Sequence, residues 1–207
     1  RDQIQKAAEA MDKGSVPQAL ANGTRAERDL QKLRDEFRQK NSNEFAEEMR
    51  QMRAAARELA QKQEELGKQM ATANDGKRKS LTDSGDRKEL TQQLDAQRER
   101  FTNLVQHATQ LTEQAENVEP LLAKQLYDTL RKTAQADANN VQQTTDELLK
   151  KGQLTQSLYD RLKKTGEEGG AKSLEATAEL LKQNFLPQAG VAEQKARKTI
   201  EDLKSGV

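Results

Sequence analysis

The only histidine of the chain is the first side chain to weigh for catalysis or metal binding. His107 lies beside Ala108 in a stretch with helical spacing, and the pattern fixes no carboxylate at a ligand-like position near it. A general base or a metal ligand needs such an orienting partner. We therefore interpret His107 as a boundary residue on a helix surface.

Carboxylates are abundant, but they stand in runs of mixed charge. Pairs such as Glu47-Glu48 and Glu64-Glu65 have Arg or Lys three or four residues away, which is the spacing of ion pairs along one helix face. A carboxylate pair for acid–base catalysis would need burial. The sequence also lacks cysteine, a phosphate-binding glycine loop and a nucleophile elbow. It predicts no enzyme, no cofactor, and no catalytic, cofactor-binding or metal-binding residue.

Two groups of residues are candidates for binding a partner. Lys77, Arg78 and Lys79 form a short basic run that could meet an anionic surface or an acidic partner, or simply form a soluble loop. Tyr127 and Tyr159 are the only tyrosines. Tyrosine is enriched at binding hot spots, and the alternative is that each ring packs over a helix seam with its hydroxyl in water.

The composition favours helices with narrow apolar seams. Of the 207 residues 33% are hydrophobic and 33% are charged, and Glu, Lys, Arg, Gln and Ala are strong helix formers. We expect no large single core. A net charge of +1 gives no field that would attract nucleic acid, which we do not expect as a partner. No apolar run approaches the roughly 20 residues that span a bilayer.

Two stretches have a regular heptad pattern. Apolar residues alternate in steps of four and three from Phe45 to Met70, and again from Leu90 to Val118, as in coiled coils. Turn dipeptides fill the segment between them. We predict an antiparallel coiled-coil hairpin over residues 41–119 with its tip near 74–86, and the alternative is a parallel dimer of two coiled coils with a flexible break.

A shorter helical hairpin is expected before this region, over residues 1–40. Its corner is at Gly14-Ser15, and its second helix has an apolar seam that includes Leu20, Leu30 and Phe37. Asn41 with Glu44 three residues later resembles a capping box. We therefore predict that a new helix begins there.

Residues 120–207 contain an internal repeat with an offset of 32 residues. Leu126-Tyr127-Asp128 matches Leu158-Tyr159-Asp160, and Glu147-Leu148-Leu149-Lys150 matches Glu179-Leu180-Leu181-Lys182. The copies are 122–153 and 154–185, followed by a last helix. We predict equivalent places for the paired leucines and tyrosines. The glycines at 166, 169 and 170 should break the second copy, while the first can continue as one helix.

The same strings, together with Phe185-Leu186-Pro187-Gln188-Ala189, resemble the Gln-rich helical region of large, uncharacterised bacterial membrane-anchored proteins. The resemblance covers about a third of the chain. It implies an extracytoplasmic helical region whose transmembrane segments lie in flanks outside this chain, and it supplies no catalytic residue.

The sequence thus predicts an all-α, elongated chain that serves as a non-enzymatic structural or protein-interaction scaffold within a larger protein. Its partner would be another protein or its own copy. The alternatives are a membrane-surface or nucleic-acid binding module that uses the basic tip, and an enzyme completed by another domain. Binding to phosphate would weaken steeply with salt, whereas packing of an apolar seam would not.

Overall fold

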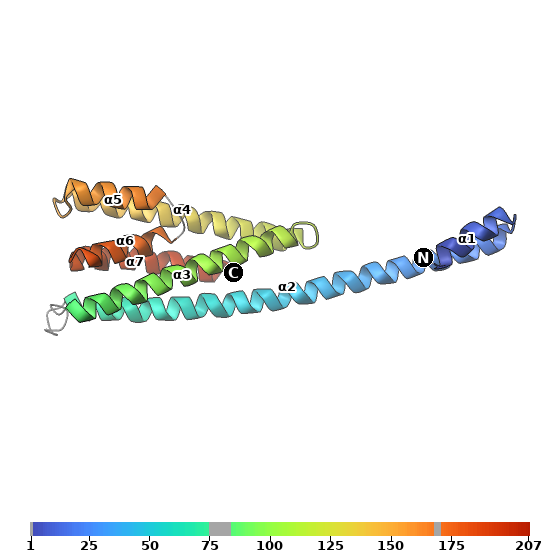
Figure 1. The fold of residues 1–207 in the computed structure, drawn as a ribbon, viewed down its shortest axis with the longest axis horizontal. Coiled ribbons are helices and arrows are strands. Elements are labelled where there is room, and N and C mark those ends of the chain that lie inside the picture. The colour runs from blue at the N-terminus through green and yellow to red at the C-terminus, as the bar shows by residue number, and fades with distance from the viewer. Residues whose placement is uncertain (1, 75–83, 168–170) are drawn as a thin grey trace. The chain divides into compact units, whose positions relative to one another are not determined.

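The computed structural model describes residues 2–74, 84–167 and 171–207, and all its regular structure in these ranges is helical, as predicted. The chain forms two compact units, Arg1–Glu47 and Glu48–Val207. The helices, labelled in Figure 1, are α1 (Asp2–Asp12), α2 (Val16–Asn74), α3 (Ser84–Ala115), α4 (Pro120–Lys150), α5 (Gln156–Glu167), α6 (Lys172–Lys182) and α7 (Leu186–Gly206).

The first unit contains α1 and the start of α2, joined at the predicted corner. Gly14 has a φ of 70°, and the amide of Ser15 donates to the carbonyl of Ala10 at 2.9 Å. Small residues line the contact, because Ala10, Ala19 and Ala26 are buried. This unit is therefore a hairpin whose interior holds little apolar volume.

Two predictions for this region are wrong. α2 is uninterrupted from Val16 to Asn74, so no new helix begins at Asn41; residues 38–48 contain no glycine or proline that would end it. The predicted seam is also largely exposed, because α1 has only 11 residues and is too short to extend along α2 from the corner to Leu33 and Phe37. The large seam residues that remain exposed by half or more are Val16, Leu20, Leu30, Leu33 and Phe37.

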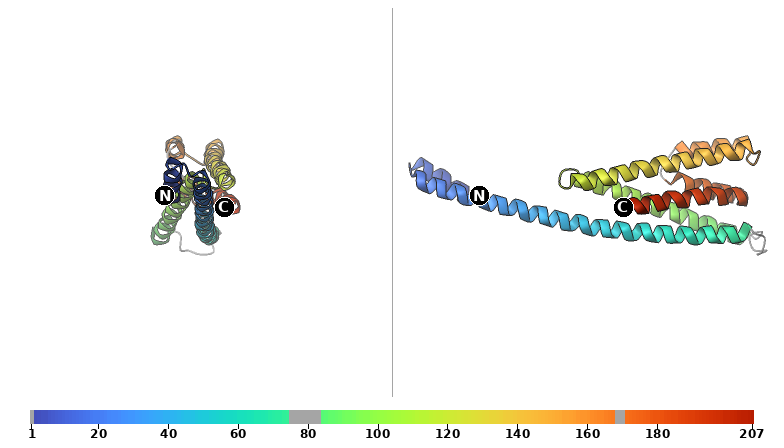
Figure 2. Two further views of the ribbon diagram at one scale, coloured as in Figure 1. Left: turned by 90° about the vertical axis from the view of Figure 1, so that its right-hand side faces the viewer. Right: turned by 180° about the vertical axis from the view of Figure 1, so that it is seen from behind.

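In the part of the second unit that the structure describes there are six helical segments, namely the C-terminal part of α2 and helices α3 to α7. Figures 1 and 2 show α6 and α7 lying between α4 and the pair formed by α3 and the C-terminal part of α2. Helix α7 packs on α4 and α6, and α3 packs on α4 and α6. Residues 48–119 of the predicted hairpin (41–119) and all of the predicted repeat region (120–207) lie together in this unit.

One apolar core runs through the second unit, in contrast to our expectation. The heptad positions from Met49 to Met70 and from Leu90 to Ala115 are buried, whereas Val118 is exposed and Phe45 is half-buried. Alanine and threonine let neighbouring helices approach closely, so a modest apolar content is enough to build this core. The largest fully buried apolar side chains are Met52, Leu94, Leu111, Leu126, Leu162, Leu180, Leu181, Ile200 and Leu203.

The two repeat copies differ in structure. The first lies mostly on the continuous helix α4, whereas the second is divided between α5 and α6. This matches the prediction that the second copy is broken and the first continues as one helix. The tyrosines do not match: Tyr127 is 59% exposed, while Tyr159 is half-buried and donates its hydroxyl proton to Asp146 Oδ1 at 2.9 Å. The predicted equivalence of the tyrosines is wrong, because α4 and α5 pack against different neighbours.

A buried aspartate in the middle of α4 caps α6. Asp137 is 4% exposed, and its carboxylate accepts hydrogen bonds from the amides of Lys172 at 2.5 Å and Ser173 at 3.0 Å. The first amides of a helix have no intrahelical acceptor. Ala171, which precedes α6, has a φ of 61° and no side-chain acceptor of its own. Asp137 therefore supplies the cap from a distant position in the sequence.

A carboxylate on α7 is buried against a glycine on α2. Glu193 is 3% exposed, and Gln63 Nε2 donates to its Oε1 at 3.2 Å. A Cβ on Gly67 would lie 2.7 Å from Glu193 Oε1. The absence of a side chain at Gly67 thus makes room for Glu193, and burial raises the pKa of Glu193 although Gln63 and Arg197 act to lower it.

Candidate interaction groove between α3 and α4

The connection between α3 and α4 holds these two helices close together at one end. The amide of Glu119 donates to the carbonyl of Ala115 at 2.7 Å, and the carbonyl of Glu119 accepts from Ala123 at 3.0 Å. Pro120 stands in the first turn of α4, where its fixed φ suits the start of a helix and its missing N–H costs nothing. The short link therefore determines where the two helices separate.

A groove of about 790 Å³ lies between the helices beside this link. Its apolar surface comes from the side chains of Val105 on α3 and of Ala123, Tyr127, Leu130 and Ala134 on α4. The tyrosine Tyr127 has the largest of these side chains and is more than half exposed. An exposed aromatic side chain within an apolar groove is typical of a binding surface.

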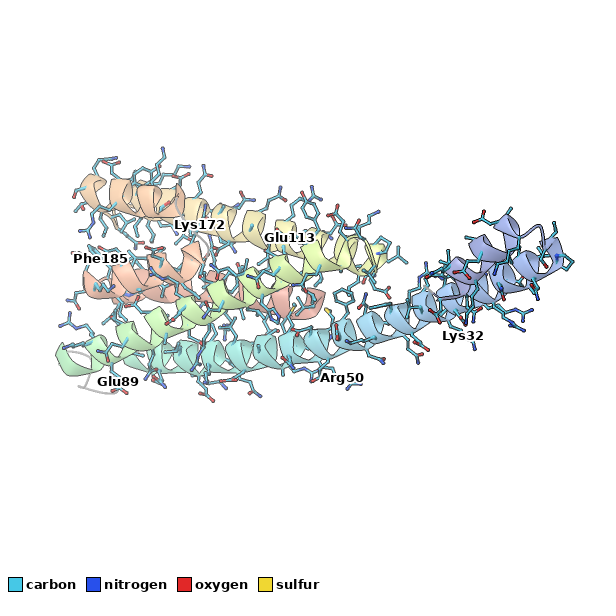
Figure 3. The ribbon with its side chains drawn as sticks, turned by 45° about the vertical axis from the view of Figure 1, so that its right-hand side comes forward. Lys32, Arg50, Glu89, Glu113, Lys172 and Phe185 are labelled. Atoms are coloured by element: carbon cyan, nitrogen blue, oxygen red, sulfur yellow. The ribbon has the colours of Figure 1, made fainter. Side chains whose placement is uncertain are left out.

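The two sides of the groove have opposite charge. Glu113 on α3 and Glu116, which directly follows α3, line one side, and Lys124 and Arg131 on α4 line the other. Glu113 is labelled near the link in Figure 3. Arg131 also contacts Asp128 at 3.8 Å in an exposed pair, which holds the guanidinium only weakly. The acidic and basic sides would orient any ligand that carries charge along both edges.

Of the predicted interaction residues, the two tyrosines do not share this groove. Tyr127 lines the groove, whereas Tyr159 is not among the lining residues and its hydroxyl is occupied by Asp146. The hydrogen bond to Asp146 is the main reason why the pKa of Tyr159 is raised. Lys77, Arg78 and Lys79 lie outside the described residues.

His107 has a partner that the sequence analysis did not identify. Its Nε2 lies 2.7 Å from Glu48 Oε2, and both side chains are about 40% exposed. The pair joins α2 to α3 at the surface beside a smaller hollow of about 410 Å³. The described part of the chain contains no group of three or more histidine, aspartate or glutamate side chains that could hold a metal ion.

Comparisons with known proteins do not assign the chain to a family. It matches no protein-family model, no curated protein and no solved structure. Among the helices that the structure describes, none combines the length and hydrophobicity needed to cross a membrane.

Proposed function

We propose that this chain is a non-enzymatic helical scaffold that binds an amphipathic helix of a protein partner in the groove between α3 and α4. The observation that carries the proposal is the groove itself, with Tyr127 on its apolar surface and charge of opposite sign on its two sides. An amphipathic helix fits such a groove because its apolar stripe and charged edges can pair with both features.

The dimensions of the groove support a helical ligand. Its residues on α4 run from Pro120 to Ala134, which is about 21 Å at 1.5 Å per residue. About four turns of a partner helix would lie along this length. A partner with basic residues on the edge near α3 and acidic residues on the edge near α4 would be favoured over its mirror arrangement.

We further propose that α3 and the C-terminal part of α2 act as an antiparallel coiled-coil hairpin that supports the groove. Contacts between the two helices support this arrangement. As the residue number increases along α2, the number of the contacting residue on α3 decreases, which is the pattern of antiparallel helices. His107 is paired with Glu48, Arg100 lies 3.9 Å from Glu58, and Gln97 Nε2 donates to the carbonyl of Leu59 at 3.1 Å. The buried heptad positions also fit a coiled coil.

A designed peptide tests whether the groove binds a helix. The peptide would have about 20 residues, leucines spaced i, i+3 and i+7, basic residues along one edge and acidic residues along the other. Its fluorescence anisotropy would be titrated with the chain. We expect binding, and we expect Tyr127→Ala to weaken it at least fivefold, since truncating a hot-spot side chain costs more than about 1 kcal/mol.

The matched control is Tyr159→Ala, which removes the same side chain outside the groove. It should leave the peptide affinity unchanged when circular dichroism shows that both variants keep their helicity. A second peptide with the same composition but without the apolar stripe should not bind. Equal binding of the two peptides, or equal effects of the two substitutions, would refute the groove as the site.

A further inference from the structure

An exposed apolar stripe on α2 has the features that the groove requires. Leu30, Leu33 and Phe37 are 56%, 50% and 58% exposed. Their spacing of three and four residues places them on one helix face. Leu30 borders a hollow between α1 and α2, but Leu33 and Phe37 do not line it. Three large apolar side chains are therefore available at the spacing expected of a docking helix.

The charges beside this stripe differ between its two edges. At about 100° per residue, Asp29 and Glu36 lie along one edge of the stripe, and Arg34 and Arg38 lie along the other. Beyond residues 29–38 the acidic and basic residues change edges, so this separation of charge is confined to residues 29–38. Arg34 contacts the neighbouring Asp35 at 3.0 Å, but both side chains are about 60% exposed, and such a pair is readily exchanged for another.

The stripe and the groove are complementary in charge. The edge with Arg34 and Arg38 matches the acidic side of the groove on α3, and the edge with Asp29 and Glu36 matches the basic side on α4. A helix turned end to end in the groove would place like charges together on both edges. Electrostatics therefore selects one direction for the docked helix. The stripe extends about 11 Å, which is shorter than the groove.

From this complementarity we propose that the groove of one molecule binds residues 29–38 of a second copy of this chain. The proposal rests on the proposed function and names the partner of that same groove. The contact is heterologous, since the stripe and the groove are different surfaces. The molecule at one end of such an assembly has a free stripe and the molecule at the other end has a free groove, so the assembly can continue beyond a dimer unless it closes into a ring.

Complementing variants provide the test. A stripe variant carries Leu33→Asp and Phe37→Asp, and a groove variant carries Tyr127→Asp and Ala134→Asp. All four side chains are exposed, so we expect both variants to keep the helicity and melting temperature of the native chain. Sedimentation velocity of the intact chain should show oligomers that grow with concentration. Each variant alone should be monomeric, and a 1:1 mixture should form a dimer and nothing larger.

Charge reversal tests the direction of docking. Arg34→Glu with Arg38→Glu should weaken self-association by roughly tenfold, by analogy with close charge pairs at other interfaces. Adding Glu113→Lys and Glu116→Lys to the same chain should restore it. Failure of the second pair to restore association would overturn the proposed orientation.

Three results would overturn the proposal. A groove variant that still dimerises would show that stripes pair with each other. An intact chain whose sedimentation does not depend on concentration would show that the second copy is not the partner. Dimers in both single variants but no gain on mixing would place the contact elsewhere. If the designed peptide binds while the intact chain stays monomeric, the proposed function stands and this inference fails. If the peptide does not bind and the intact chain stays monomeric, both fail.

Discussion

Truncation of leucines between α2 and α3 should lower the stability of the second unit by a predictable amount. Leu59 and Leu104 are 2% and 5% exposed, and both line the hollow of about 410 Å³ between these helices. Leu59→Ala removes three carbons, which is worth about 2.4 kcal/mol at roughly 0.8 kcal/mol each. Measured losses for buried leucines span about 2–5 kcal/mol.

The hollow beside Leu59 and Leu104 narrows the range of the expected stability loss. Side chains beside an existing hollow have fewer contacts to lose and more freedom to relax, so we expect about 2–3.5 kcal/mol for Leu59→Ala or Leu104→Ala. For a unit of this size that corresponds to a decrease in melting temperature of roughly 5–12 °C. Because the two leucines share one hollow, the double variant should deviate from additivity by at least about 0.5 kcal/mol.

Urea unfolding followed by circular dichroism measures these free energies. The control is Leu121→Ala, which makes the same truncation at a side chain that is 77% exposed and should change stability by less than about 0.5 kcal/mol. An unchanged midpoint for Leu59→Ala, or a loss for Leu121→Ala as large as that for Leu59→Ala, would refute the assignment of these leucines to the core.

Three further changes test the buried polar groups. Burial raises the pKa of Glu193, so the folded chain binds the carboxyl proton more tightly than the unfolded chain does. The stabilisation that results from this proton is complete below the ordinary glutamate pKa. It is lost as pH rises through the raised pKa of the folded chain. In thermal melts, Glu193→Gln should therefore gain stability relative to the native chain as pH rises above the ordinary glutamate pKa of about 4.3; an unchanged stability difference over this rise would contradict the burial of the carboxylate. Gly67→Ala should destabilise the native chain by steric conflict with Glu193, but it should stabilise a Glu193→Ala background by up to about 1 kcal/mol; the same sign in both backgrounds would contradict the contact. Asp137→Ala should cost about 2–4 kcal/mol in urea unfolding because it leaves two amides at the start of α6 without an acceptor, and a cost below 1 kcal/mol would show that the cap is dispensable.

The helical class and the buried heptad positions were predictable because they depend on local periodicity. Gly14 could also be read as a corner, since a positive φ is easily adopted by glycine. The burial of α2 differs along its length: the same kind of apolar spacing is buried at Leu59 but exposed at Leu33. Periodicity identifies a helix face, but it does not reveal whether another helix extends far enough to cover it.

The polar features depend on contacts between distant residues. Asp137 caps a helix that begins 35 residues later, and no spacing rule relates the two. Glu193 does share a face with Ala196 and Ile200, so its burial on α7 had a detectable signal. The groove likewise needs the relative placement of α3 and α4. From the sequence, Tyr127 is a candidate for binding a partner, beside the alternative that its ring packs over a helix seam.

Site-directed thiol labelling tests the central claim most directly, because the chain contains no cysteine. Ala134→Cys places one thiol in the groove, and Leu121→Cys places one on exposed surface outside it. The rate of maleimide modification would be measured with and without a saturating concentration of the designed helix. We predict at least tenfold slower modification of Ala134→Cys and an unchanged rate for Leu121→Cys; equal rates with and without the helix at Ala134→Cys would contradict the claim that the groove is the binding site.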